Sequence, residues 1–287
     1  MILKDFIFSY TQSIKKDLNK KKYFKAFRKL FNYPYKLLLD KVRQFLSLKK
    51  YNLDKDKENK NLKFLSLDDL FIRFNSDKAS EFVMNDKKIH GHNYSPFYEK
   101  YFFRYKNKKK ISILEIGSLR GAATASFYYY FDNPNIICAD INPFQIQVYS
   151  KNIRSVFVDT QSNDTLKNLS FFLDQEFDII IDDGSHNIRD QIITFNIFFR
   201  KLKKNGWYVI EDSSQYLSAS HLNPDNLRYG TNEIISSVKN KQSKKINYLS
   251  TTDIDILSQS IGNIFLEKGN YIENKINISE IIFIEKS

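Results

Sequence analysis

Acidic side chains end five separate apolar runs of the sequence, each about as long as a buried β-strand. They are Glu115, Asp140, Asp159, the pair Asp182-Asp183 and the pair Glu211-Asp212. In an open α/β sheet, ligands bind beyond the carboxyl ends of the strands. Five acidic strand ends at one edge of one sheet therefore predict a ligand site rather than a solvated surface.

The segment Asp182-Asp183-Gly184-Ser185-His186 is the most informative of these. Its two carboxylates can meet Glu211 and Asp212 from the next strand, and hard oxygen ligands suit Mg²⁺ rather than structural zinc. A histidine beside such a cation could remove a proton from a substrate hydroxyl. The alternative is that His186 caps a helix and the acids hold a cofactor.

A glycine turn, Gly117-Ser-Leu-Arg-Gly121, follows the first of the predicted strands. Such a turn lets a ligand approach the backbone closely and opens a helix. Asp140 follows Gly117 by 23 residues, near the spacing of an acid that binds ribose hydroxyls. NAD and S-adenosylmethionine both fit, and so does a purely structural turn. Because the turn has no basic phosphate clamp, we favour a sulfonium ligand at this acidic rim.

Strands that alternate with helices must position these residues. We expect strands at 111–117, 135–141, 155–160, 177–183 and 206–212, helices at 120–131, 143–152, 164–174, 187–203 and 231–240, and a terminal strand pair at 261–269 and 281–287. This alternation predicts an α/β fold with a doubly wound, mostly parallel, Rossmann-like sheet that is covered on both faces.

The basic charge of the chain is concentrated at its front. The 287 residues carry a net charge of +12, and residues 1–60 hold 15 Lys and 2 Arg against 6 acids, a net charge of +11. Apolar spacing over 1–48 predicts helices, which Pro34 should separate, and the polar stretch 51–61 reads as a linker. We expect a helical hairpin on its own domain or on a second subunit; contact with an anionic membrane or a partner enzyme is the alternative.

Composition excludes several classes of protein. Apolar residues make up 42% of the chain, so it is not wholly disordered. A lone cysteine, Cys138, excludes a disulfide scaffold and a thiolate zinc cluster and suits a reducing compartment. The first residues make a poor secretory signal, and no apolar run is long enough to span a membrane. We expect a cytoplasmic protein, with peripheral contact at the inner membrane face left open.

The block LEIGSLRGAATASF…ICADINP…VDTQSND…FDIIIDDGSHNIRDQIITF…LKKNGWYVIEDSSQY resembles class I S-adenosylmethionine-dependent methyltransferases. More narrowly it resembles the macrocin O-methyltransferase group, which methylates sugar hydroxyls. The segment SDKAS…HGHNYSPFYEKYF resembles the leader segment of that group. The similarity covers about residues 75–216. The motif DDGSH followed by IED is specific, whereas GSLRG departs from the usual G-x-G-x-G.

The resemblance implies a role for each matching residue. Glu115, Gly117, Ser118 and Gly121 would hold the amino-acid end of the methyl donor, and Asp140 would bind its ribose hydroxyls. Asp159 and Gln161 would lie near its adenine, and Asp182 would lie near its ammonium group. Mg²⁺ or Mn²⁺ would bind Asp183 and Asp212, with Glu211 as a further ligand, and the catalytic pair would be His186, as general base, and Asp183. The acceptor pocket would be lined by His90, His92, Tyr94 and Glu99, for which ordinary packing is an equal alternative.

These expectations combine into a metal-dependent O-methyltransferase that acts on a sugar or nucleotide-sugar hydroxyl, in bacterial surface-polysaccharide or other glycan biosynthesis. Its parts would be a basic helical extension (1–60), a leader segment (61–110) and a Rossmann-like methyltransferase domain (111–287). The alternatives are an RNA or protein methyltransferase, a non-catalytic scaffold and a nicotinamide oxidoreductase. We expect no DNA partner and disfavour RNA, because the charge outside the front segment is close to neutral; a homo-oligomer stays open.

Overall fold

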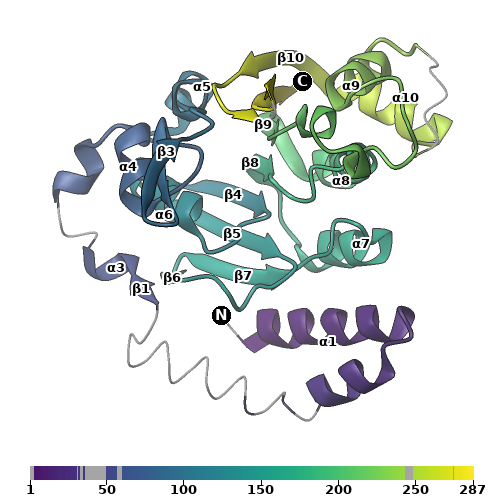
Figure 1. The fold of residues 1–287 in the computed structure, drawn as a ribbon, viewed down its shortest axis with the longest axis horizontal. Helices are drawn as coiled ribbons and strands as arrows, with labels where there is room; N and C mark the ends of the chain where they lie inside the picture. The colour runs from purple at the N-terminus through teal and green to yellow at the C-terminus, as the bar shows by residue number, and fades with distance from the viewer. Residues whose placement is uncertain are drawn as a thin grey trace.

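The computed structural model describes residues 3–30, 32, 35, 50–56, 60–242, 248–273 and 275–287. Its main sheet contains the strands β4 (Ile111–Ile116), β5 (Pro134–Asp140), β7 (Ile153–Phe157), β8 (Phe177–Asp182), β9 (Leu202–Ile210), β10 (Ile261–Lys268) and β13 (Glu280–Lys286). They lie in the order β10-β13-β9-β8-β4-β5-β7 (Figure 1). β13 runs antiparallel to both of its neighbours, and the central pairs are parallel. The predicted mostly parallel sheet and its terminal strand pair are confirmed.

Helices cover both faces of this sheet. They are α1 (Leu3–Asn19), α3 (Leu53–Asp56), α4 (Leu67–Phe74), α5 (Ser95–Phe102), α6 (Ala122–Tyr130), α7 (Asn163–Phe172), α8 (Ile188–Phe198), α9 (Thr231–Lys239) and α10 (Thr251–Ser260). Side chains alternate along a strand, so Ile113 of β4 packs in the cluster under α4, α5 and α6, and Leu114 packs in the cluster under α7 to α10. This two-sided burial explains why the strands read as continuous apolar runs.

Short strands form small two-stranded sheets beside the main sheet. They are β1 (Tyr51–Asn52), β2 (Glu81–Met84), β3 (Lys87–His90), β6 (Val148–Tyr149), β11 (Ile272–Glu273) and β12 (Ile276–Asn277). They pair as β1-β6, β2-β3 and β11-β12. The helix expected at 143–152 is wrong, because this segment forms a loop and then β6, which pairs with β1 in parallel. Ile146 and Val148 are buried on either side of an exposed Gln147, which is the two-residue period of a strand.

The linker expected at 51–61 is also wrong over its first part. Leu53 is fully buried, and the Asp54 carboxylate accepts hydrogen bonds from the Tyr128 hydroxyl at 2.7 Å and the Ser150 hydroxyl at 2.8 Å. The sequence also holds an unpredicted helix, α10, whose N-terminus is closed by a capping box between Ser250 and Asp253. That Ser-x-x-Asp spacing is a readable helix start.

The front of the chain forms helices, as expected, over α1 and residues 23–30, with a turn between them at 20–22. The expected break at Pro34 and the apolar positions after it lie outside the described residues. α1 lies along the edge strand β7, where the Phe157 backbone N–H donates to the Ser9 hydroxyl at 2.8 Å. Arg154 donates to the fully buried Asp5 at 2.7 Å. α1 therefore packs on its own sheet.

No helix in the described part of the chain is both long and apolar enough to cross a membrane.

Candidate active site

Asp183, His186 and Asp212 come together at the carboxyl end of the sheet. Each offers a ligand atom, and the three atoms lie within 4.8 Å of one another. β8 and β9 are parallel neighbours with Asp182 opposite Ile210, so the residues that follow them emerge side by side. His186 Nε2 lies 3.8 Å from Asp183 Oδ1. The predicted meeting of the DDGSH segment with Asp212 is therefore seen in the structure.

Two of these residues have an unusual backbone. His186 and Asp212 adopt left-handed conformations, with φ of 55° and 53°. This region costs a non-glycine residue about 1 kcal/mol and persists only where the surroundings enforce it, often at functional sites. His186 Nδ1 is buried and has no hydrogen-bond partner among the described residues. The other ring nitrogen, Nε2, is the one that lies toward Asp183.

The leader segment supplies two partners of Asp212. The Tyr94 hydroxyl donates to Asp212 Oδ1 at 2.6 Å, and His92 Nδ1 lies 3.0 Å from the same oxygen. Burial would raise the pKa of Asp212, but the hydrogen bond and charge of His92 lower it to about 2. Burial would likewise lower the pKa of His92, which the hydrogen bond to Asp212 raises. Asp212 is thus a stable anion, and His92 and Tyr94 hold it in place.

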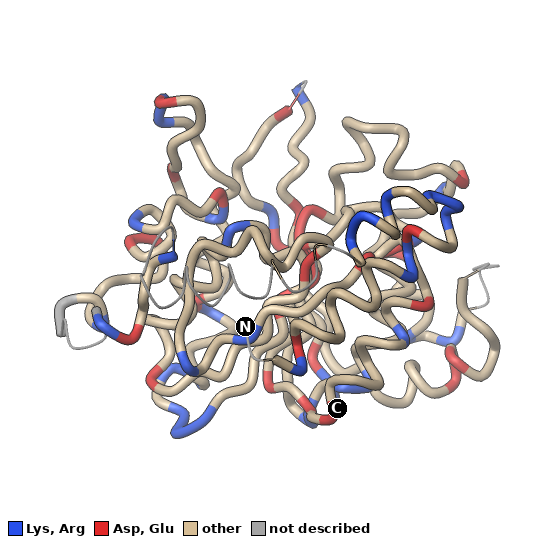
Figure 2. The backbone as a smooth tube through the Cα atoms, turned by 90° about the horizontal axis from the view of Figure 1, so that it is seen from below, with Lys and Arg blue, Asp and Glu red and all other residues tan. Residues whose placement is uncertain are grey.

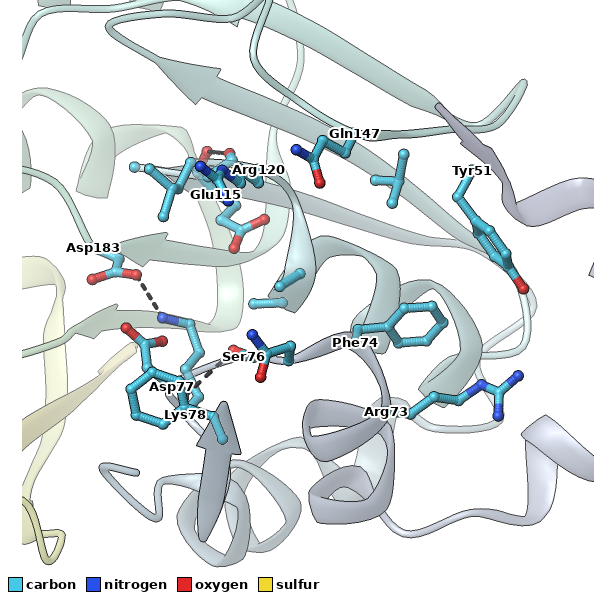
Figure 3. A pocket seen from close by; sticks show the side chains of 18 of the residues that line it. Tyr51, Arg73, Phe74, Ser76, Asp77, Lys78, Glu115, Arg120, Gln147 and Asp183 are labelled. Atoms are coloured by element: carbon cyan, nitrogen blue, oxygen red, sulfur yellow. Dashed lines mark hydrogen bonds and ion pairs between the residues drawn. The ribbon is translucent and has the colours of Figure 1, made fainter. Parts of the chain in front are cut away.

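Lys78, which the sequence interpretation did not single out, points its ammonium at Asp183 (Figure 3). Its Nζ is 2.5 Å from Asp183 Oδ2 and 2.6 Å from Glu211 Oε2. Burial would lower its pKa, yet the two carboxylates raise it well above the usual value. Burial and the charge of Asp183 raise the pKa of Glu211. One ammonium thus faces the buried Glu211 and the partly exposed Asp183.

Glu211, expected as a further metal ligand, is placed differently from Asp183 and Asp212. Its carboxylate accepts from Lys78 and from the hydroxyl of Tyr98. The leader segment, which contains both partners, thus takes up this carboxylate, and the group of three ligands forms without it. The sequence holds no local signal for this contact, because Lys78 and Glu211 lie 133 residues apart.

The glycine turn closes against the loop that follows β8. Gly117 has a φ of +92°, and a Cβ there would lie 1.8 Å from the carbonyl oxygen of Asp183. Gly121 has a φ of +86°, and its Cβ would come within 2.8 Å of Ile146 Cγ1. Both positions therefore require glycine because a side chain there would clash with neighbouring residues of the protein, whether or not a ligand is bound. Ser118 is buried, and its hydroxyl donates to the Glu115 carbonyl at 3.1 Å.

Asp140 ends β5 beside this turn, as predicted. Its Oδ2 accepts from the Leu119 backbone N–H at 2.8 Å, and its Oδ1 accepts from the Asn142 N–H at 2.7 Å. These bonds fix the carboxylate with lone pairs to spare. Burial raises its pKa. The geometry is compatible with a grip on ribose hydroxyls.

The other residues that were expected to bind the methyl donor have hydrogen-bond or ion-pair partners within the protein. Asp159 forms an ion pair with Lys16 of α1 at 2.7 Å, and the exposed Gln161 donates its backbone N–H to Asp159 Oδ1 at 3.2 Å. Asp182 is buried, accepts from the Gly184 N–H at 3.3 Å, and has a pKa that burial raises to about 8. A role opposite the donor's ammonium therefore requires that the bound donor lower this pKa.

A cleft of 1070 Å³ opens beside the site. Asp183 and Lys78 lie at one end of it and Tyr51 and Arg73 at the other (Figure 3). Between them it is lined by Phe74, Ser76, Glu115, Gly117, Ser118, Leu119, Arg120 and Gln147. The cleft thus joins the glycine turn and the ligand group to the leader segment.

Two residues expected in an acceptor pocket have other places. His90 ends β3 with an exposed side chain, opposite Glu81. Glu99 Oε1 accepts from the backbone N–H of Leu67 at 2.7 Å, and so satisfies a free donor at the start of α4. The acceptor role of both residues stays a prediction.

Comparison with known proteins decides the family. Residues 107–269 match the model of a family described as "Methyltransferase domain". The chain belongs to this methyltransferase family. The Rossmann-like fold of class I methyltransferases, which the sequence predicted, is thereby confirmed.

Individual relatives match parts of the methyltransferase. It is 29% identical to the demethylmacrocin O-methyltransferase of Streptomyces fradiae over 128 residues, which are 42% of this chain and 32% of that protein. The solved MycE methyltransferase from the mycinamycin biosynthetic pathway, in complex with Mg and SAH, is 20% identical, with a TM-score of 0.56, over 77% of this chain and 55% of its own. A MycE structure that also holds mycinamycin VI gives the same identity and TM-score. The chain spans about a third of the curated relative and about half of MycE, and the MycE likeness shows the fold.

The pH dependence of the stability of the methyltransferase tests whether the pKa of Glu115 is raised. Burial raises its pKa from 4.5 to about 7. The folded state therefore binds this proton more tightly, and the associated stability is full below pH 4.5 and is lost as the pH rises to about 7. In urea unfolding, Glu115→Gln should be as stable as the native protein at pH 4.5 and more stable at pH 8, by up to about 3 kcal/mol. A stability difference that does not change with pH would contradict this assignment.

Proposed function

We propose that this protein is an S-adenosylmethionine-dependent, Mg²⁺-assisted O-methyltransferase that acts on a sugar hydroxyl. The observation that supports it most is the group Asp183, His186 and Asp212, packed directly against the glycine turn at Gly117. Membership of the methyltransferase family and the similarity to demethylmacrocin O-methyltransferase point the same way. So does the fold shared with MycE, whose structures hold Mg and SAH.

The donor would bind over the turn that begins at Gly117. Asp140, held by the Leu119 and Asn142 backbone, would accept hydrogen bonds from the ribose hydroxyls. Glu115 at the floor of the cleft would face the amino-acid end. The donor supplies an electrophilic methyl group on a positive sulfur. An acidic surround favours that charge before transfer, while transfer itself neutralises it, so precise positioning should supply much of the rate.

The donor atoms at the site fit a divalent cation. Asp183 and Asp212 offer carboxylate oxygens, and the low pKa of Asp212 keeps one of them charged over a wide pH range. When bound, such a cation lowers the pKa of a nearby acceptor hydroxyl. His186 would take the hydroxyl proton at Nε2, which lies 3.8 Å from Asp183 Oδ1. The acceptor oxygen then forms its bond to the methyl carbon as the bond from that carbon to sulfur breaks.

The acceptor would enter through the 1070 Å³ cleft that ends at Asp183. Its volume is ample for a sugar that is attached to a larger group. We propose a sugar or nucleotide-sugar acceptor, in a bacterial surface-polysaccharide or related glycan pathway at the cytoplasmic side of the membrane. This context is supported by the macrocin-type resemblance, and the cleft limits only the size of the acceptor.

A methyl-transfer screen tests the proposal. The protein is incubated with S-adenosylmethionine and a panel of nucleotide sugars, with Mg²⁺, with Mn²⁺ or with a chelator, and methylated sugar is measured by mass spectrometry. We expect transfer to at least one sugar, loss of transfer on chelation and recovery on adding either metal. Binding of NAD with no binding of S-adenosylmethionine or its demethylated product would contradict the proposal. Full activity in the presence of chelator would support the methyltransferase assignment and would contradict the role of the cation.

A further inference from the structure

The first two helices form a hairpin with an apolar outer surface. We call α1 together with residues 20–30 the front hairpin. Seven of its large apolar side chains are exposed, with exposed fractions between 45% for Leu18 and 80% for Phe24. The exposed set is Leu3, Ile7, Leu18, Tyr23, Phe24, Phe27 and Leu30. Few surfaces of a folded domain leave so many large apolar groups in water.

These side chains are arranged as stripes. At about 100° per residue, positions 23, 24, 27 and 30 fall within roughly 120° of one helix face, and positions 3, 7 and 18 fall within roughly 60° of α1. The packed faces adjoin these stripes, because the buried Ala26 lies about 40° from Leu30 and the buried Phe6 about 60° from Leu3 around the helix axis. Each helix therefore packs inward on one face and exposes an apolar stripe beside it.

The charge of the front hairpin has a single sign at its surface. Its only acidic residues are Asp5 and Asp17, and both are buried. Asp5 pairs with Arg154, and Asp17 pairs with Lys29 at 2.5 Å. The exposed charged residues are Lys4, Lys15, Lys20, Lys21, Lys22, Lys25 and Arg28. The hairpin thus presents apolar stripes and unopposed positive charge together.

We propose that the front hairpin binds the surface of an anionic lipid membrane, lying in the plane of the headgroups. Aromatic and aliphatic side chains would enter the headgroup region while Lys and Arg side chains contact anionic lipid. A nucleic acid would satisfy the positive charge, but it offers no apolar layer for Phe24 or Leu30. The lipid surface satisfies both features, so it is the partner that this chemistry fits best.

The hairpin is rigidly joined to the catalytic part of the chain. Arg154 of β7 donates a hydrogen bond to Asp5, and Lys16 forms an ion pair with Asp159, just beyond the end of the same strand. Figure 1 shows α1 along the edge of the molecule beside β7, and Figure 2 views the molecule from that side. Bound through this edge, the sheet would have a fixed orientation relative to the membrane.

Vesicle co-sedimentation of the full chain tests the proposal. We expect binding to vesicles of phosphatidylcholine with phosphatidylglycerol, little binding to phosphatidylcholine alone, and weakening with added salt. Phe24→Ser with Leu30→Ser should weaken binding about 10-fold or more, since two apolar groups no longer enter the interface. Lys21→Gln with Lys22→Gln and Lys25→Gln should weaken it on anionic vesicles to a similar extent.

A matched control removes the same kinds of group elsewhere. Phe103, which is 75% exposed, and the exposed Lys109 and Lys110 lie outside the front hairpin, so Phe103→Ser with Lys109→Gln and Lys110→Gln should bind vesicles like the native protein. Thermal unfolding of every variant confirms that it is folded. Equal binding to both vesicle types would overturn the proposal, as would retained binding in the Phe24→Ser/Leu30→Ser variant. Tight binding to a homopolymeric RNA that this variant does not weaken would replace the lipid partner by a nucleic acid.

Discussion

Replacement of His186 by alanine is expected to lower kcat about 10²-fold or more, the scale of a lost general base. The affinity for S-adenosylhomocysteine, measured by calorimetry, should stay unchanged, because the donor is expected to bind over the turn at Gly117. His186 reaches the ligand group from a left-handed backbone conformation, with Nε2 3.8 Å from Asp183 Oδ1. That arrangement suits a group that exchanges a proton with a bound acceptor.

The same variant separates the two roles that the geometry allows. His186 offers an atom to the group of possible metal ligands, so it could hold the cation instead of the proton. A metal-ligand role predicts that high Mg²⁺ restores kcat in His186→Ala, whereas a base role predicts no restoration. His221, an exposed histidine beyond β9, gives the control, and His221→Ala should leave kcat and Mg²⁺ dependence unchanged.

Replacement of Lys78 by methionine is expected to lower the free energy of unfolding by about 3–5 kcal/mol, the usual cost of removing one partner from a buried ion pair. Lys78 is 3% exposed and pairs with both Asp183 and Glu211. Without it, the buried Glu211 and the partly exposed Asp183 lie together with no cation between them. Urea unfolding at pH 7 measures the loss.

A second change should recover part of that loss. Glu211→Gln removes one of the two orphaned charges while its side-chain oxygen still accepts from Tyr98, so Lys78→Met/Glu211→Gln should be more stable than Lys78→Met. The control is Lys203→Met, because Lys203 is 39% exposed and its partner Asp178 keeps Lys108. That change should cost less than about 1 kcal/mol. A double variant no more stable than Lys78→Met would show that charge is not the cause.

The central sheet could be predicted from the sequence because its strands are buried on both faces. Each strand reads as an apolar run with an acidic end, and the structure places those ends at one edge. The same reasoning gave a wrong prediction for the segment 143–152. Its few apolar residues fit a helix by spacing, but their partner, β1, lies about 100 residues earlier in the chain. A pairing over that distance leaves no local pattern.

The candidate site was predictable where it depended on neighbouring strands and unpredictable where it depended on the leader. The sequence placed Asp183, His186 and Asp212 together because adjacent parallel strands end together. It could not show that Lys78 reaches Glu211, a contact across 133 residues. Nor could it distinguish His92, which contacts Asp212, from His90, which faces solvent two residues earlier. On a short irregular segment, only tertiary packing decides which side chain turns inward.

The helix that covers β7 has a consequence for how the protein is made. α1 leaves the ribosome long before β7, and its buried Asp5 meets Arg154 only after another 149 residues have been added. Until then its inward face is exposed, and so is the edge of β7 once that strand forms. An uncovered strand edge is a template for pairing with another chain. The interval between synthesis of α1 and its docking is therefore the period in which the nascent protein is most exposed to aggregation or chaperone capture.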